Sequence, residues 1–291
     1  MDYQTILYQV KDRILTLTLN RPDKLNSFTV EMSQELINAY QRASEDDSVS
    51  VIIVTGAGRA FCAGMDLSID GNVFGLNEEL KPTIKDMRER SEDDDIISGV
   101  RDAGGRVVLA MYECKKPIIG AINGAAVGIG ATMTCAMDIR LASQKAKVGF
   151  VFNKIGITPE ACSSWFLPRL VGLSTALEWC YTAEILDSET LKDARFVKEI
   201  CEPEHLLRKA NLIAQKIINF SPVAIAMTRQ MMYRNSAESD PIKAHEIDSL
   251  AIFYSSLGSG KEGVSSFLEK REAKFTDKAS SDMPDFYPWW K

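Results

Sequence analysis

Apolar and polar residues alternate with a period of two at the start of the chain. Residues 6–10 and 13–20 are therefore predicted to form two strands of a hairpin that turns at 11–12. A loop leads to a predicted helix over about 30–43, with apolar side chains on one face and Thr29 as candidate N-cap. The apolar run at 49–55 predicts a buried strand.

An uncharged segment, residues 117–137, has glycines at positions 120, 124, 128 and 130. It predicts a buried strand over 117–122, a glycine turn, and a buried helix from about Gly130. Such a unit directs free backbone N–H groups to one point, where they can hold a negative oxygen. Two alternatives stay open on this segment alone: a membrane span, which Asn123 and the glycines weaken, and a packing unit without chemistry.

Further strands are expected after this segment, at 138–142 and near 147–152. Residues 157–164 are expected to start a helix, because Thr158 suits its N-cap and Pro159 its first turn. Strands that alternate with helices in the first half of the chain predict a single α/β body.

The rest of the chain is expected to be helical. Residues 68–107 are polar, with an acidic run at 92–95, and are expected to form a partly mobile helical insertion before a helix at 108–114. From 173 onward the pattern is that of helices. The aromatic tail at 283–291 is expected to pack on another surface, since its exposure would be costly.

Composition narrows the functional classes. The 291 residues are 45% hydrophobic and 25% charged, as in ordinary globular proteins, and the net charge of −6 disfavours a nucleic-acid partner. Six scattered cysteines and a start without signal-peptide features fit reduced thiols in a cytoplasmic protein. Two unrelated histidines make a zinc site improbable. Gly56-x-Gly58 is a weak dinucleotide signal, because Phe61 occupies the third glycine position.

Two motifs in order, F-C-A-G-M-D-L at 61–67 and N-G-A-A-V-G-I-G at 123–130, resemble the crotonase (enoyl-CoA hydratase/isomerase) superfamily. The resemblance covers nearly the whole chain. It implies an α/β crotonase-like spiral of ββα turns over 1–210, which holds the acyl-CoA site, and a helical trimerisation region over 211–291. It also implies a homotrimer or dimer of trimers, an acyl-CoA thioester as substrate, no membrane span, no metal, and no cofactor beyond the coenzyme A of the substrate.

The resemblance implies an oxyanion hole formed by the backbone N–H groups of Met65 and Ile129. Deprotonation next to a thioester places negative charge on the carbonyl oxygen, and the loss of one such donor typically costs about 2.7–4 kcal/mol. The expected contacts with the coenzyme A thioester are Lys24, Leu25, Ala63, Met65, Asp66, Leu67, Phe275 and Lys278. The resemblance implies that the last two, with Phe267, help to complete the coenzyme A site, either in the same subunit or from a neighbouring one.

The position of carboxylates distinguishes activities within this superfamily. Hydratases carry glutamates at the positions that match Thr132 and Phe152, and neither residue here is an acid. The segment T-P-E-A-C-S-S at 158–164 is instead similar to Δ3,Δ2-enoyl-CoA isomerases, in which one acidic residue moves a proton. Glu160 is therefore the expected catalytic base. Its alternative is a structural role in the first turn of a helix, where the dipole would lower its pKa, whereas burial would raise it.

Three functions remain open from the sequence. The first is a Δ3,Δ2-enoyl-CoA isomerase that works through Glu160. The second is an enoyl-CoA hydratase or another crotonase lyase, in which Glu160 would activate a water. The third is a non-catalytic acyl-CoA-binding module, since chromodomain-Y-like domains share parts of the pattern. An intact Glu160 favours an enzyme, and the missing acids at 132 and 152 favour the isomerase.

Overall fold

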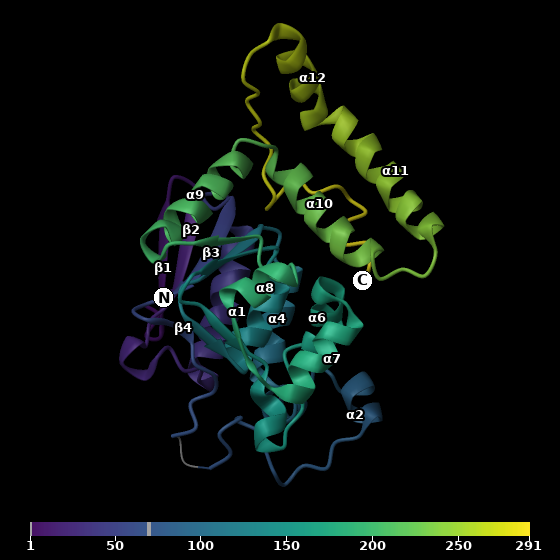
Figure 1. Ribbon diagram of the computed structural model, residues 1–291. Helices are drawn as coiled ribbons and strands as arrows, with labels where there is room; N and C mark the ends of the chain where they lie inside the picture. The colour runs from purple at the N-terminus through teal and green to yellow at the C-terminus, as the bar shows by residue number, and fades with distance from the viewer. Residues whose placement is uncertain (1, 69–70) are drawn as a thin grey trace.

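The computed structural model describes residues 2–68 and 71–291 (Figure 1). Within them, ten strands form two sheets. The larger sheet has the strand order β1 (Ile6–Lys11), β2 (Ile14–Leu19), β3 (Val51–Gly56), β5 (Ile118–Ile122), β7 (Ile139–Ser143) and β10 (Glu199–Cys201). The smaller sheet has the order β4 (Ala60–Cys62), β6 (Ala125–Val127), β8 (Lys147–Gly149) and β9 (Ile185–Asp187).

Successive turns of the chain supply one strand to each sheet. The pairs β3/β4, β5/β6 and β7/β8 all follow this rule, and the strands of successive turns pair in parallel in both sheets. Among the strands of the described residues, only β1 with β2 and β8 with β9 pair antiparallel. This arrangement is the expected spiral of ββα turns.

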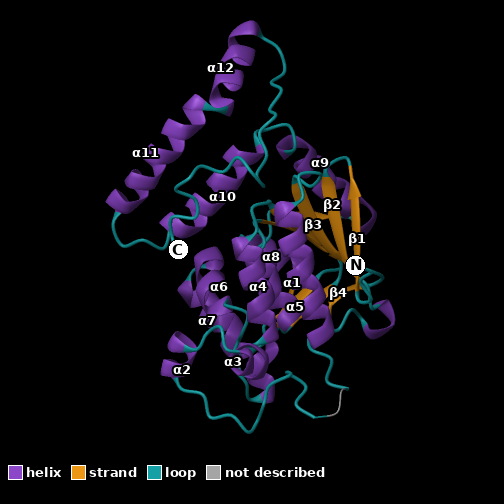
Figure 2. Cartoon of the chain, turned by 180° about the vertical axis from the view of Figure 1, so that it is seen from behind, coloured by secondary structure: helices purple, strands orange, loops and turns teal. Residues whose placement is uncertain are grey.

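Helices cover both faces of the larger sheet (Figures 1 and 2). On one side, α1 (Val30–Glu45) and α4 (Ala103–Glu113) enclose the main core, which includes Ile52 and Val54. On the other side, α9 (Leu206–Ile217) packs on Val51 and Ile53. Because alternate side chains of β3 enter two different cores, the strand is apolar throughout.

Three further groups of helices complete the chain. The insertion contains α2 (Ile84–Glu89) and α3 (Asp94–Gly99). The spiral contains α5 (Ile129–Thr132), α6 (Ser163–Val171), α7 (Leu173–Thr182) and α8 (Ser188–Asp193). The C-terminal part contains α10 (Pro222–Asn235), α11 (Pro241–Leu257) and α12 (Ser259–Glu269). Short 3-10 turns are η1 (Pro22–Lys24), η2 (Met133–Ala136), η3 (Val151–Ile155) and η4 (Pro203–His205). None of the helices in the described ranges is both long and apolar enough to cross a membrane.

The prediction that a helix starts with Thr158 as N-cap is wrong. Helix α6 begins only at Ser163, and Thr158 caps nothing. Ala161 and Cys162 have φ angles of 56° and 52°, in the left-handed region that a right-handed helix does not admit. Glu160 therefore lies in an irregular turn rather than in the first turn of a helix.

Several other boundaries differ from expectation. The helix expected at 108–114 begins five residues earlier, at Ala103, with Asp102 as its N-cap. The strand expected near 147–152 ends at Gly149 and continues as η3. Strands β9 and β10 interrupt the region expected to be helical from 173. Part of the expected mobile insertion, residues 69–70, lies outside the described residues.

One segment of the C-terminal part packs on the larger sheet, whereas two of its helices extend away from it (Figures 1 and 2). Residue 210, the expected end of the spiral core, lies inside α9, whose Ala210 and Ala214 both pack in the core of the larger sheet. The sheet-packed body therefore extends through α9, whereas α11 and α12 extend away from it (Figures 1 and 2). The aromatic tail packs as expected: the Arg234 guanidinium lies 3.3 Å from the Trp290 ring centroid.

Candidate active site

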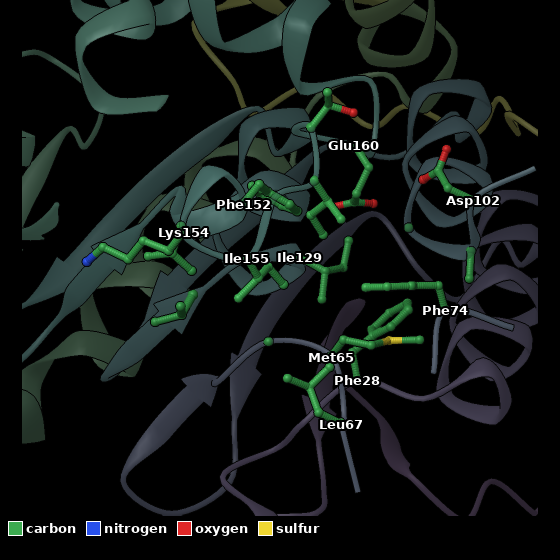
Figure 3. Close-up of a pocket in the computed structure, with 18 of the residues that line it drawn as sticks. Phe28, Met65, Leu67, Phe74, Asp102, Ile129, Phe152, Lys154, Ile155 and Glu160 are labelled. Carbon is green, nitrogen blue, oxygen red and sulfur yellow. The ribbon is translucent and has the colours of Figure 1, made fainter. Parts of the chain in front are cut away.

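A cavity of about 470 Å³ lies beside the smaller sheet, between its glycine turns, the start of α4 and the segment from η3 to Glu160 (Figure 3). Most of its walls are apolar and include Phe28, Phe74 and Phe152. Figure 3 shows the Lys154 ammonium directed away from Glu160. The interior of the cavity therefore suits an apolar chain of a ligand, and only a few of its lining groups are polar.

The first polar wall is formed by two turns, Gly64–Met65 and Gly128–Gly130, which we call the glycine wall. A Cβ on Gly64 would lie 3.2 Å from the Val127 carbonyl oxygen, and one on Gly130 would lie 2.1 Å from the Cys62 carbonyl oxygen. Gly64 has a φ of 105° as well. Only glycine lets the two turns come this close.

The glycine wall offers unpaired main-chain donors. Met65 and Ile129 each directly follow a glycine of positive φ, and both line the cavity. Within the described ranges, neither backbone N–H donates a hydrogen bond to another group. The structure thus brings the two expected oxyanion donors to one cavity (Figure 3).

The second polar wall consists of Asp102 and Glu160, together with the buried Thr132, which contacts Glu160 but does not itself line the cavity; we call these three residues the carboxyl wall. The Thr132 hydroxyl donates to Glu160 Oε1 at 2.7 Å. Burial raises the pKa of Glu160 to about 8; the Thr132 hydrogen bond opposes this rise, and the neighbouring Asp102 carboxyl adds to it. A dipole-stabilised, acidic Glu160 was the structural alternative, and both its position and its pKa contradict that alternative.

Asp102 was missed by sequence reasoning. It lies within the insertion, directly before α4, and lines the cavity beside Glu160 (Figure 3). Its position directly before the helical run of α4, where Asp is a favoured N-cap, was the available signal. That signal indicates a helix start but not a place in the cavity.

Asp66, by contrast, is engaged elsewhere. Its carboxylate pairs with Arg21 at 2.8 Å and accepts from the Ser68 hydroxyl at 2.6 Å. The hydrogen bonds from Ser68 and Arg21 hold its pKa well below the usual range. It does not line this cavity, and its expected contact with the coenzyme A thioester stays a prediction.

The other expected contact residues fall into three places. Ala63, Met65 and Leu67 line the cavity. Lys24 and Leu25 lie at the end of η1, where the Leu25 carbonyl accepts from Ala63 N–H at 3.1 Å. Phe275 and Lys278 lie beyond α12, and Phe275 lines a separate cavity. A single chain does not bring these last two residues to the first cavity.

The family model for enoyl-CoA hydratase/isomerase matches residues 9–278. The chain belongs to the enoyl-CoA hydratase/isomerase family. It is 37% identical over 270 residues to the enoyl-CoA hydratase AKT3-2 of Alternaria alternata, covering 91% of this chain and 84% of that protein. It is 32% identical to the 1,2-epoxyphenylacetyl-CoA isomerase of Escherichia coli, covering 94% of this chain and 98% of that protein.

Solved structures of the family have the same fold. The enoyl-CoA hydratase of Bacillus anthracis superposes with a TM-score of 0.81 at 27% identity, covering 94% of this chain and 99% of that chain. The protein is therefore a crotonase-fold member of an acyl-CoA-processing enzyme family. Its relatives carry both hydratase and isomerase names, so the family alone does not select the reaction.

Proposed function

We propose that the protein is a Δ3,Δ2-enoyl-CoA isomerase that acts through a thioester enolate. The observation that carries this proposal is one half-buried glutamate, Glu160, which faces the same cavity as two unpaired backbone donors. The residues at 132 and 152, where hydratases carry acids, are Thr132, which has only a hydroxyl, and Phe152. A single base that removes and returns a proton needs no second acid at those positions.

Each group has one role in the proposed reaction. Glu160 removes a proton from C2 of a 3-enoyl-CoA, and the resulting enolate oxygen accepts hydrogen bonds from the Met65 and Ile129 N–H groups. Glu160 then returns the proton to C4, so that the double bond moves from C3–C4 to C2–C3. The coenzyme A belongs to the substrate, and the proposed steps use no metal or redox cofactor.

The pKa of Glu160 makes this reaction dependent on pH. A base acts in its ionised form, and with a pKa of about 8 only about a tenth of the Glu160 side chains are ionised at pH 7 before substrate binds. Since kcat/KM reports the free enzyme, it is expected to rise from pH 6 and to level off above pH 8.

Hydration is the second candidate, because several relatives, among them AKT3-2, are named hydratases. In that reaction Glu160 would activate a bound water that attacks C3 of a 2-enoyl-CoA. The test supplies 3-enoyl-CoA and 2-enoyl-CoA in H₂¹⁸O and follows double-bond position and ¹⁸O uptake by mass spectrometry. Movement of the double bond without ¹⁸O uptake supports the isomerase. Binding of both thioesters without turnover would indicate the non-catalytic module instead.

We further propose that the protein forms a trimer or a dimer of trimers through its C-terminal helices. Large apolar side chains are exposed on α11 and α12: Phe253 is 56% exposed, Val264 61% and Phe267 83%. Leaving such a surface in water is unfavourable, and association covers it. The separate cavity lined by Phe275 is the proposed place where this region meets the coenzyme A of a bound thioester. A stable monomer in light scattering at micromolar concentration would contradict the assembly.

A further inference from the structure

The cavity contains a second carboxyl, Asp102, to which neither of the two proposed reactions gives a role. It enters from the start of α4, an element remote in sequence from the turn that carries Glu160. Figure 3 shows both carboxyls on the same side of the cavity. The neighbouring Asp102 carboxyl is one of the groups that raise the pKa of Glu160.

Asp102 also holds the backbone that follows Glu160. Its Oδ1 accepts from the Ala161 N–H at 3.2 Å and from the Gly105 N–H, which caps α4. Ala161 and Cys162 are both in the left-handed region, which non-glycine residues occupy only when their surroundings hold them there. The Asp102 carboxylate is one such restraint, since it binds the first of the two residues directly.

The first turn of α4 is fitted closely to the Glu160 carboxyl. A Cβ on Gly104 would lie 2.1 Å from Glu160 Oε2 and 2.3 Å from Ile129 Cδ1. The Glu160 carboxyl is therefore enclosed on two sides: Thr132 donates to Oε1, and the start of α4 lies against Oε2. A displacement of α4 would thus move the proposed base.

We propose that Asp102 is a positioning residue for Glu160, which fixes the turn that carries Glu160 through its bond to the Ala161 N–H. This inference rests on the proposed role of Glu160 as the base. The neighbouring Asp102 carboxyl also raises the pKa of Glu160, and a higher pKa makes Glu160 a stronger base once it is ionised.

Other titratable groups near Glu160 change charge outside the relevant pH range. The thiols of Cys62 on β4 and Cys135 in η2 lie near enough to interact with its charge, and burial raises the pKa of each to about 12. Burial also raises the pKa of Cys162, which Arg101 opposes from the insertion. Of Glu160 and these thiols, Glu160 is therefore the group whose charge changes between pH 5 and pH 8.

The test compares Asp102→Asn with Asp102→Ala. Asparagine keeps an oxygen that accepts from Ala161 and Gly105 but removes the charge, so the rise of kcat/KM is expected to move to lower pH by about one unit. Alanine removes the restraint as well, and at least a tenfold loss of kcat is expected, as for a displaced catalytic group. Asp187→Asn is the matched control, because Asp187 caps α8 through Thr190 N–H and lies outside the cavity.

An unchanged pH profile for Asp102→Asn, with the thermal stability of the wild type, would overturn the proposal and leave Asp102 as a helix cap only. A second readout does not depend on turnover. Infrared difference spectra of the unliganded protein, with Glu160→Gln as the reference, titrate the Glu160 carboxyl directly. A lower titration midpoint of Glu160 in Asp102→Asn than in the wild type supports the proposed role of Asp102, and an equal midpoint contradicts it. If the wild type and Asp102→Asn both lack isomerase activity but differ in the titration midpoint of Glu160, the proposed function is wrong and the positioning role of Asp102 stands.

Discussion

The glycine wall and the carboxyl wall face the same cavity but are built in different ways. The glycine wall presents main-chain N–H groups, and its shape depends on positions where a Cβ would lie within 3.2 Å of a carbonyl oxygen. The carboxyl wall presents side chains from three elements, at positions 102, 132 and 160, which meet only in the folded protein. Substitutions should therefore affect the first wall through the backbone and the second through side-chain chemistry.

The largest effect is expected on the carboxyl wall, from Glu160→Gln. The amide cannot accept a proton from C2, and loss of a general base costs roughly 10²–10⁴-fold in rate. Thioester binding and thermal stability should persist, as measured by calorimetry and thermal melting. Glu178→Gln, on the exposed face of α7, serves as the control. Retention of more than about a tenth of the wild-type rate would show that Glu160 is not the base.

On the glycine wall, Met65→Pro should differ sharply from Met65→Ala. Proline deletes the backbone N–H, and loss of one oxyanion donor lowers kcat by about 10²–10³-fold. Alanine keeps the donor and should have a mild effect. Steady-state kinetics on variants with native circular dichroism spectra make the comparison. Equal losses in the two variants would mean that the Met65 side chain, rather than its amide, matters.

Gly104→Ala tests the junction of the two walls. Its Cβ would overlap Glu160 Oε2 and Ile129 Cδ1, so both groups must move. A displacement of about 1 Å near the chemistry can cost up to 10²-fold, and a loss of kcat of about 10- to 100-fold is expected. The control is Gly263→Ala, another helical glycine, whose Cβ would make an ordinary 3.9 Å contact with Phe275. If Gly104→Ala retains full activity, the close fit of α4 to Glu160 has no catalytic importance.

The smallest effect is expected from Thr132→Val. Valine keeps the shape but removes the hydroxyl that donates to Glu160, so the pKa of Glu160 should rise. The rise of kcat/KM should then move to higher pH, opposite in direction to the shift from Asp102→Asn, with a loss of several-fold at pH 7. Thr132→Ser keeps the hydroxyl and should resemble the wild type. A Thr132→Val profile that moves to lower pH would contradict the assigned hydrogen bond.

The two walls also differ in how far the sequence predicts them. The glycine wall follows from local signals, because strands next to glycines at 64, 128 and 130 indicate tight turns. The periodicity of residues 14–19 and the apolar run at 49–55 likewise predict the larger sheet. The three-residue strands β4 and β6 are too short to show a period, so the smaller sheet follows from the family resemblance rather than from the pattern.

The carboxyl wall depends on contacts that no local pattern contains. Glu160 was found through its resemblance to one group of isomerases, and Asp102 was not found at all. The left-handed conformation of Ala161 and Cys162 has no signal in the sequence, since neither is a glycine or an asparagine. Proline at 159 then favoured a helix start that the folded chain does not use. The pKa of Glu160 follows from burial and so from the complete fold.

The ratio of isomerisation to hydration tests the central claim most directly. Turnover of 3-enoyl-CoA and of 2-enoyl-CoA is measured on wild-type protein with matched acyl chains of several lengths, since an unsuitable chain would depress both rates. With a single base and no acid at 132 or 152, isomerisation is expected to exceed hydration by at least about 100-fold, the low end of a missing acid–base contribution. Faster hydration than isomerisation across those chain lengths would contradict the account and would assign the carboxyl wall to water activation.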